Sequence, residues 1–370
     1  MVTISPCRTA KELKLFERVP EILHEKDRYF VPPFPGSISK LFKKSSPFLR
    51  HGELHPFIAY REKKPVGRIV AIVNRAHNTY HGDQVGFFGF FDSINDVTVA
   101  QSLFAKVKEV LSAKGLTSAR GPYCPTINDE CGVLTEGFES TPFVMMPYNP
   151  SYYPALYEAV GLQKARDLYA FYLSAAVNAP ERIEKIVNRV KRSTGIELRP
   201  LEMSRLNDEL KIIQKLYNET LNRNWGFVPL EYEDLQFAAI DLKAIIDPGL
   251  VMFAEKNGEP VGFSMVIPNI NEILWRVKSS KGLLRILKFI WYLKTSHPRE
   301  ARLAVLGVSP EFRNKGVASL FYFETLSRGK RKYLGGELSW IDEDNEEIMN
   351  GIRVMGGQKY KSYRIYESSL

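Results

Sequence analysis

The two halves of the chain repeat short sequence patterns in the same order. The patterns Phe-Val-Pro, Pro-Val-Gly and Gly-x-Gln-Lys occur in both halves, at 30–32 and 227–229, 65–67 and 260–262, and 161–164 and 356–359. One short match carries no information, but an unchanged order indicates an internal duplication. We therefore expect two copies of one fold, over 1–176 and 196–370, joined by a linker helix over 177–195.

Each copy has the same predicted order of elements. A strand (2–4; 196–200) leads to a helix (about 10–25; about 203–222), and a hairpin, a strand, a helix, a strand, a helix and a final strand follow. The hairpin turns fall at Glu62–Lys64 and at Asn257-Gly258, a pair that favours positive φ and a tight turn. This order predicts an α/β (α+β) fold, in which each copy is a mixed, mostly antiparallel sheet flanked by helices.

The amino-acid composition is typical of a globular protein with a buried core in each half. The 370 residues are 44% apolar, so each half can bury a core. The three cysteines form no CxxC pair, which suits a reducing cytoplasm. The first residues do not resemble a signal peptide, and no apolar run is long enough to span a membrane. We expect a cytoplasmic enzyme.

The net charge of +9, from 51 Lys+Arg and 42 Asp+Glu, favours an anionic partner. Nucleic acid, an anionic membrane and the phosphates of coenzyme A all qualify. The excess charge is spread along the chain, and no zinc-finger, basic-zipper or aromatic RNA-binding pattern occurs. Nucleic acid is therefore not an expected partner.

The segment Arg302–Ser327 is typical of a phosphate-binding turn. It comprises an apolar strand, a turn at Ser309-Pro310, the loop Arg313–Ala318 and an amphipathic helix. Two cations and Gly316 stand where the helix begins, so backbone N–H groups and the helix dipole can hold a pyrophosphate. Neither GxxxxGK[ST] nor GxGxxG occurs, so the nucleotide loops fit less well.

The spacing Arg-x-x-Gly-x-Ala after Val-x-Pro resembles the acyl-CoA loop of the GNAT (GCN5-related N-acetyltransferase) superfamily. The following strand at 336–341, the turn at Asn345, a short helix, Gly356-Gly357 and a strand at 361–366 match that family's order. The resemblance covers about 196–370 well and 2–173 weakly, and the whole chain looks like a bacterial tandem GNAT-like protein.

The resemblance implies an N-acyltransferase that takes acyl-CoA or acetyl-CoA as co-substrate, acts on an amine acceptor and needs no metal. The backbone of Leu306 and Val308 would hold the pantetheine arm, and a nearby backbone N–H would stabilise the oxyanion. Asn345 would contact the pantetheine side. The pyrophosphate would lie on Arg313, Asn314, Lys315, Gly316, Val317, Ala318 and Ser319.

Glu337 is the candidate general base, because a carboxylate flanked by Leu338 and Trp340 can have a raised pKa. Alternatively, it is an outward-facing strand residue. Many family members have a tyrosine where this chain has Ile352. Either Tyr360 or Tyr363 takes its place as general acid, or the thiolate leaves unassisted. The missing tyrosine keeps a second function open, a non-catalytic acyl-CoA or lipid-binding module.

The first copy lacks the phosphate loop. Its counterpart, Phe91–Ala100, has neither glycine nor cation and carries two Asp, so we expect CoA only in the second copy. The Tyr-rich loop from Gly121 to Tyr153 either packs on its own domain or lines the acceptor pocket, to which we assign Trp340, Tyr152 and Tyr153. Cys124 and Cys131 have no cationic neighbour in the sequence, so we expect no cysteine nucleophile.

Two further patterns are less specific. The HxxxH pairs His51/His55 and His77/His81 lack a third ligand and form no HExxH, so we expect no metal site. An insertion at about 269–300 contains a basic amphipathic helix, in which Lys281, Arg285 and Lys288 share one face. Such a helix can pack against a domain, cover an acyl chain, or make peripheral membrane contact through 281–294.

Overall fold

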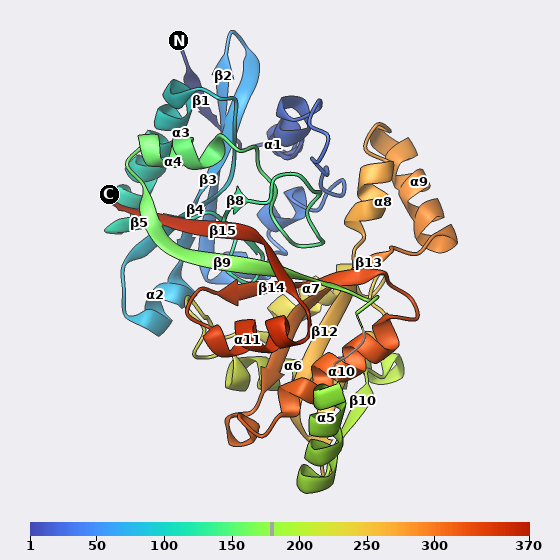
Figure 1. Ribbon diagram of the computed structural model, residues 1–370. Helices are drawn as coiled ribbons and strands as arrows, with labels where there is room; N and C mark the ends of the chain where they lie inside the picture. The colour runs from blue at the N-terminus through green and yellow to red at the C-terminus, as the bar shows by residue number, and fades with distance from the viewer. Residues whose placement is uncertain (178–180) are drawn as a thin grey trace. The chain divides into compact units, whose positions relative to one another are not determined.

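A computed structural model describes residues 1–177 and 181–370, which form two compact units. The first unit comprises 1–168, 273–295 and 361–370, and the second comprises 169–272 and 296–360 (Figure 1). Most of the last strand and most of the insertion thus belong to the first unit, whereas the sequence division at residue 176 places them with the second copy.

The first unit is a mixed sheet with helices on both faces. Its strands lie in the order β1-β2-β3-β4-β5-β15, and β4–β5 is a parallel pair. Its elements are β1 (Thr3–Pro6), α1 (Ala10–Leu23), β2 (Gly52–Arg61), β3 (Lys64–Asn74), α2 (Arg75–His81), β4 (Val85–Ser93), α3 (Val97–Ala113), β5 (Ser118–Gly121), β6 (Tyr123–Cys124), β7 (Glu130–Cys131), β8 (Val133–Glu136) and α4 (Tyr153–Ala159).

The second unit repeats this plan. Its strands lie in the order β10-β11-β12-β13-β14-β9, with β13–β14 as a parallel pair. Its elements are α5 (Glu181–Thr194), β10 (Ile196–Pro200), α6 (Leu206–Thr220), α7 (Tyr232–Leu242), β11 (Val251–Lys256), β12 (Glu259–Pro268), β13 (Glu300–Val308), α10 (Val317–Gly329), β14 (Gly335–Asp342) and α11 (Glu346–Val354). The predicted fold class and the tandem arrangement are confirmed.

The pairing of two strands explains why the compact units differ from a division of the chain at one residue. The final strand β15 (Gln358–Ser369) pairs with β5 through Tyr366–Ser369, and Arg120 binds Glu367 across that pair. Conversely, β9 (Gln163–Ser174), the last strand of the first half, lies next to β14, and Ala175 donates its N–H to Leu334 O at 2.8 Å. Each half therefore closes its sheet with a strand from the other half.

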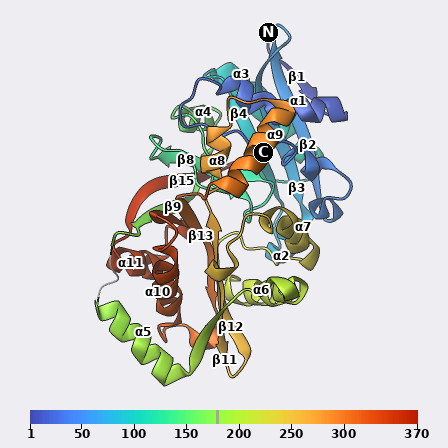
Figure 2. The same cartoon turned by 90° about the vertical axis from the view of Figure 1, so that its right-hand side faces the viewer.

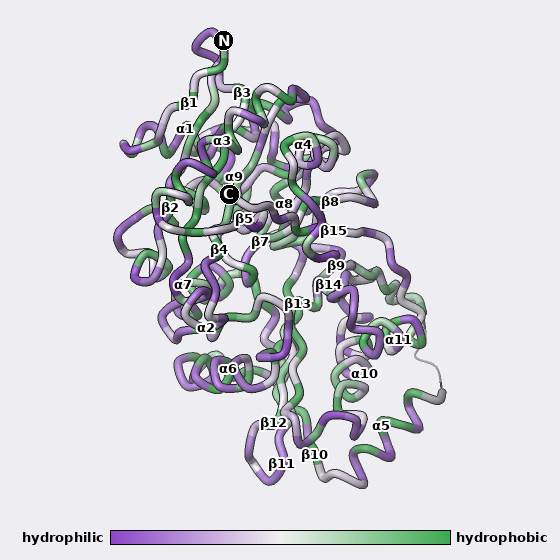
Figure 3. The backbone as a smooth tube through the Cα atoms, turned by 90° about the vertical axis from the view of Figure 1, so that its left-hand side faces the viewer, coloured by the Kyte–Doolittle hydropathy of each residue, from purple (hydrophilic) through white to green (hydrophobic). Residues whose placement is uncertain are grey.

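Helix α5 is part of a core as well as a connection. Its Ile183, Val187 and Val190 are buried against Val317 and Leu320 of α10. Apolar residues recur every three or four positions in α5 and α6, and Figure 3 shows hydrophobic and hydrophilic residues alternating around both helices. The predicted linker helix, so far as it lies in the described residues, thus packs beside α10. Residues 178–180 of the predicted linker lie outside the described part of the chain.

The insertion forms two helices, α8 (Asn271–Arg276) and α9 (Gly282–Thr295). Of the predicted alternatives, packing on a domain is observed, because α9 lies beside α1 in the first unit (Figure 2). No helix in the described ranges is both long and apolar enough to cross a membrane.

Candidate functional site

Strands β13 and β14 separate part-way along their length. Their parallel register runs from Glu300–Gly335 to Leu303–Leu338, and β13 continues to Val308. At the same point β12 pairs Met265 with Val305 and Val266 with Leu303, which leaves Ala304 as the extra residue of a bulge. A bulge turns backbone groups away from the ladder. The edge of β13 beyond Leu303 can therefore hydrogen-bond a ligand lying where β14 has departed.

The loop after β13 ends at a helix N-terminus that no side chain caps. Gly316 has a φ of 79° and is the N-cap residue of α10, without a side-chain hydrogen bond. The first N–H groups of a helix have no acceptor within the helix. In α10 these first N–H groups belong to Val317, Ala318 and Ser319. Ser319 N donates to Gly316 O at 3.0 Å, and the N–H groups of Val317 and Ala318 can bind an anion.

The two predicted loop cations differ in their contacts. Arg313 donates from Nη2 to Thr220 O at 2.8 Å, which ties the loop to the end of α6. Lys315 is exposed, and its Nζ lies 5.1 Å from the centre of the Phe312 ring. Asn314 is exposed and has positive φ. Arg313 therefore shapes the loop, and Lys315 is the cation facing solvent.

Other predicted binding residues occupy the expected elements. Leu306 and Val308 pair with Ser264 and Gly262 of β12 and pack on the core beneath α10. Asn345 caps α11, where its side-chain oxygen accepts from Ile348 N at 3.3 Å. Ile352, at the position of the missing tyrosine, is 1% exposed and packs against Leu338.

Glu337 lies in a buried polar network directly before the strands separate. It is 0% exposed, so the outward-facing alternative is wrong. Its Oε1 accepts from Ser339 Oγ at 2.6 Å and lies 3.8 Å from Arg302 Nε, and its Oε2 accepts from the Tyr360 hydroxyl. The structure thus brings Tyr360 to Glu337. Tyr363 lies in the first unit and is fully buried.

A second carboxylate lies on the neighbouring strand. Glu300 Oε1 accepts from the Tyr172 hydroxyl at 2.8 Å, and the ring centres of Tyr172 and Tyr360 are 6.0 Å apart. Burial, with smaller contributions from Glu272 and Glu337, raises the pKa of Glu300. Sequence reasoning missed Arg302, Tyr172 and Glu300. The available signal for Glu300 and Arg302 was a pair of charged residues at the start of the otherwise apolar strand β13.

Trp340 follows this network on β14, past the point of separation. The Arg302 guanidinium lies 5.2 Å from the centre of its ring. Its Nε1 is buried and has no hydrogen-bond partner among the residues that the structure describes. A buried indole N–H without a partner is costly. Trp340 therefore offers a donor to a ligand at the separated strands.

The equivalent region of the first unit is closed. The parallel register of β4 and β5 ends at Phe87–Arg120, but the next backbone lies directly on β4: a Cβ on Gly89 would meet Tyr123 O at 1.5 Å. The Asp96 side chain caps α3, accepting from Thr98 N at 2.8 Å, and binds Arg61 Nη2 at 2.7 Å. That hydrogen bond from Arg61 lowers the pKa of Asp96. The Asp96 carboxylate thus occupies the N-terminus of α3, where a bound anion would otherwise lie.

Tyr152 and Tyr153 belong to the first unit, whereas Trp340 belongs to the second. The Tyr152 hydroxyl donates to Ser93 O at 2.7 Å. The Tyr153 hydroxyl lies 3.0 Å from His24 Nε2 and 3.2 Å from Asp92 Oδ1. Arg68 completes this buried cluster with a 2.7 Å contact to Asp92 Oδ2. Both tyrosines hold α4 to β4. Of the two predicted alternatives for this loop, these contacts fit packing on its own domain.

Burial keeps the thiols of Cys7 and Cys124 in their protonated form. Burial raises the pKa of the Cys7 thiol to about 12 and also raises that of Cys124. A raised pKa disfavours the thiolate. Within residues 1–177 and 181–370, no group of three or more His, Cys, Asp or Glu is arranged to hold a metal ion.

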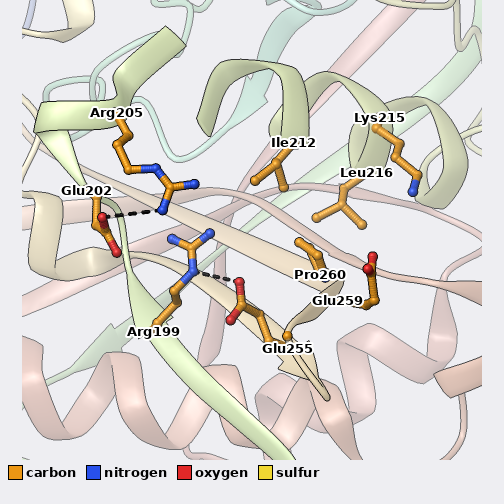
Figure 4. Close-up of a pocket in the computed structure, with 10 residues that line it drawn as sticks. Arg199, Glu202, Arg205, Ile212, Lys215, Leu216, Glu255, Glu259 and Pro260 are labelled. Carbon is orange, nitrogen blue, oxygen red and sulfur yellow. Dashed lines mark hydrogen bonds and ion pairs between the residues drawn. The ribbon is translucent and has the colours of Figure 1, made fainter. Parts of the chain in front are cut away.

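A cavity of about 460 Å³ lies between β10, α6 and the β11–β12 hairpin (Figure 4). Three cations and three carboxylates line it, and Arg199 binds Glu255 at 2.6 Å. None of the predicted site residues contributes to its lining. Because its charges balance, this cavity is a weaker phosphate site than the N-terminus of α10.

Comparison with known proteins agrees with this geometry. The profile of the Acetyltransferase (GNAT) family matches residues 210–349. The chain is 33% identical to the bacterial ceramide synthase of Caulobacter vibrioides, over 100% of this chain and 98% of that protein. It is 30% identical to the protein YghO of Escherichia coli, over 97% and 93%. The chain belongs to the GNAT superfamily.

A solved tandem GNAT protein of the clavulanic acid biosynthesis pathway shares the fold along both halves. It aligns over 100% of this chain and 98% of its own length, with a TM-score of 0.60 at 11% identity. This neighbour shows the tandem fold alone, whereas the family profile and the Caulobacter relative show that our chain is an acyltransferase by family. GNAT enzymes in general bind acyl-CoA and an amine acceptor.

Proposed function

We propose that this tandem GNAT protein is an acyl-CoA-dependent N-acyltransferase that binds CoA in its second unit only. The observation that carries the proposal is the contrast between equivalent regions of the two units. In the second, β13 and β14 separate and α10 begins with uncapped N–H groups. In the first, backbone fills the gap and Asp96 caps α3.

In the proposed complex, the pantetheine arm adds to the free edge of β13 at Leu306 and Val308. The pyrophosphate lies on the N–H groups at the start of α10, beside Lys315 and Ser319. Asn345 is close to the pantetheine side, and Trp340 Nε1 supplies a hydrogen bond to the donor or the acceptor. Each role uses a group with hydrogen-bonding capacity at the open region of the sheet.

The proposed chemistry moves one proton. The acceptor nitrogen attacks the thioester carbonyl, backbone N–H at the Ala304 bulge stabilises the oxyanion, and the C–S bond breaks. Glu337 takes the proton that the nitrogen loses, and Tyr360 protonates the departing thiolate. Because Tyr360 donates its hydrogen bond to Glu337, the proton on Glu337 then restores the phenol. The net change is transfer of a proton from nitrogen to sulfur.

The proposed acceptor is a long-chain amino alcohol, the kind of amine whose N-acylation gives a ceramide. The full-length similarity to a protein named bacterial ceramide synthase supports this class. In this proposal the first unit does not bind CoA, and its Tyr152 and Tyr153 keep the packing role of their hydrogen bonds to Ser93, His24 and Asp92.

Calorimetry with CoA tests the binding proposal. We expect one site per chain and no binding by Gly316→Glu, whose side chain would bring a carboxylate to the phosphate position. Gly258→Glu is the control for positive φ, since Gly258 shares that backbone conformation, although a Cβ there would meet nothing within 4 Å whereas one at Gly316 would meet Val190. Two sites per chain, or equal affinities for the two variants, would contradict the proposal.

A second function, a non-catalytic acyl-CoA or lipid-binding module, is favoured by one observation. The position of the missing tyrosine is filled by Ile352, which lies in the core and has no proton to give. Thiol release from acyl-CoA in the presence of long-chain amino alcohol separates the two functions. Binding without thiol release, in wild type and Tyr360→Phe alike, would support the module; release that Tyr360→Phe slows would support the enzyme.

A further inference from the structure

Helix α9 exposes its apolar side and buries a charged one. Arg285 is 4% exposed and donates to both carboxylate oxygens of Glu21 on α1, at 2.6 and 2.9 Å, and to Ser280 O at 2.8 Å. Phe289, one turn later, packs on Phe34 with ring centres 5.1 Å apart. These two residues fix which side of the helix faces the first unit.

The opposite side carries five large apolar side chains that are between 43% and 71% exposed. We call this set the α9 outer face; it consists of Leu283, Leu284, Leu287, Ile290 and Trp291. At 100° per residue these positions span about a third of the helix circumference, so they form one continuous stripe. An exposed apolar stripe of this size marks an interaction surface.

The charged residues around the α9 outer face indicate what binds to it. Lys281 and Lys288 are exposed along one flank of the α9 outer face, Lys294 is exposed at its C-terminal end, and α9 contains no acidic residue. On α1, the helix against which α9 packs, the exposed side presents Lys11, Lys14 and Arg18 before Ile22. Apolar side chains with Trp, flanked by lysines, are the composition of helices that lie in a membrane interface.

We propose that α9 is a membrane-docking helix that inserts its outer face into the interface of a lipid bilayer containing anionic headgroups. The Arg285–Glu21 contact holds the helix so that the apolar side chains point away from the first unit, and the lysines meet the headgroup charge. This inference uses only the surface of α8–α9 and α1, and does not depend on CoA binding or on turnover.

Three further hydrogen bonds attach the α8–α9 segment to the first unit. Trp275 Nε1 donates to Arg28 O at 2.9 Å, and Lys278 Nζ donates to Asp27 O and Arg28 O at 3.2 and 3.0 Å. These bonds attach the α8–α9 segment to backbone carbonyls of the loop that follows α1. The segment is therefore fixed to the first unit independently of its apolar outer face, as a docking helix requires.

Co-sedimentation of the full chain with vesicles tests the proposal. We expect binding to phosphatidylcholine vesicles with roughly one third phosphatidylglycerol, and at least tenfold weaker binding of Leu287→Gln/Trp291→Gln. Lys288→Gln/Lys294→Gln should weaken binding by roughly fivefold per lysine removed, and raised salt should do the same. Ile240→Gln is the matched control, because Ile240 is 73% exposed on α7, outside this surface.

Each alternative has its own result. If wild type does not sediment with the vesicles that contain phosphatidylglycerol, or if Leu287→Gln/Trp291→Gln binds like Ile240→Gln, the proposal is wrong. If light scattering shows a dimer that only Leu287→Gln/Trp291→Gln dissociates, and vesicles do not bind, the outer face is a self-association surface. Circular dichroism of each variant confirms that exposed substitutions leave the fold intact, and CoA calorimetry on the same samples keeps the result separate from the proposed function.

Discussion

Substitution of Gly316 by alanine tests the packing that positions the proposed CoA-binding loop. Gly316 has a φ of 79°, and a Cβ there would lie 2.7 Å from Val190 Cγ2 of α5. Positive φ costs an alanine about 1 kcal/mol. Overpacking against a buried valine adds roughly 1–3 kcal/mol, since Val190 lies in the core with Val317 and Leu320. We therefore expect Gly316→Ala to lower the free energy of unfolding by roughly 2–4 kcal/mol.

Gly258→Ala separates the two contributions. Gly258 has a φ of 82° but nothing within 4 Å of the added Cβ, so only the backbone cost of about 1 kcal/mol applies. Urea denaturation followed by tryptophan fluorescence measures both variants, and calorimetry should show weaker CoA binding for Gly316→Ala alone. Val190→Ala in the Gly316→Ala background should recover part of the loss. Equal destabilisation of the two glycine variants, or no recovery, would refute the packing argument.

Three further outcomes follow from the polar contacts. Because burial raises the pKa of Glu300, its ionised form costs stability above that pKa; Glu300→Gln should be more stable than wild type in urea at neutral pH and indistinguishable below the unfolded pKa of about 4.3. Asp92→Asn leaves buried Arg68 without a carboxylate and should cost about 3–5 kcal/mol by denaturation, more than Asp167→Asn, whose partner Arg364 is more exposed. Asp96→Ala removes the cap of α3 and should cost about 1 kcal/mol, yet calorimetry should still find one CoA site, since Gly121–Tyr123 still fill the gap.

Local features of the fold were predictable because local chemistry determines them. The hairpin turn at Asn257-Gly258 follows from two residues that accept positive φ, and both have it. The break between β13 and α10 follows from Gly316, and the helix beyond it from its apolar periodicity. The internal repeat predicted the second set of elements from the first, since both copies need the same apolar faces.

Pairing between distant strands could not be predicted in the same way. Nothing in the sequence of β15 distinguishes β5 as its partner, because Arg120 and Glu367 look like ordinary strand charges until they are paired. The same limit applies to the site. Glu337 was identified as a candidate base, but its burial with Arg302 depends on the register of β13 and β14. The direction of Arg285 likewise depends on Glu21 of a helix at the other end of the chain.

The exchanged final strands affect how this chain is made in the cell. When residues 1–168 leave the ribosome, β5 has a free edge, because its neighbour β15 is not yet synthesised. An open strand edge is a template for wrong pairing. The first unit therefore stays incomplete during the synthesis of nearly the whole second unit, until residues 361–370 are made and close its sheet. A nascent chain stalled before Lys361 would carry an unfinished sheet in its oldest part, a substrate for chaperones and proteases.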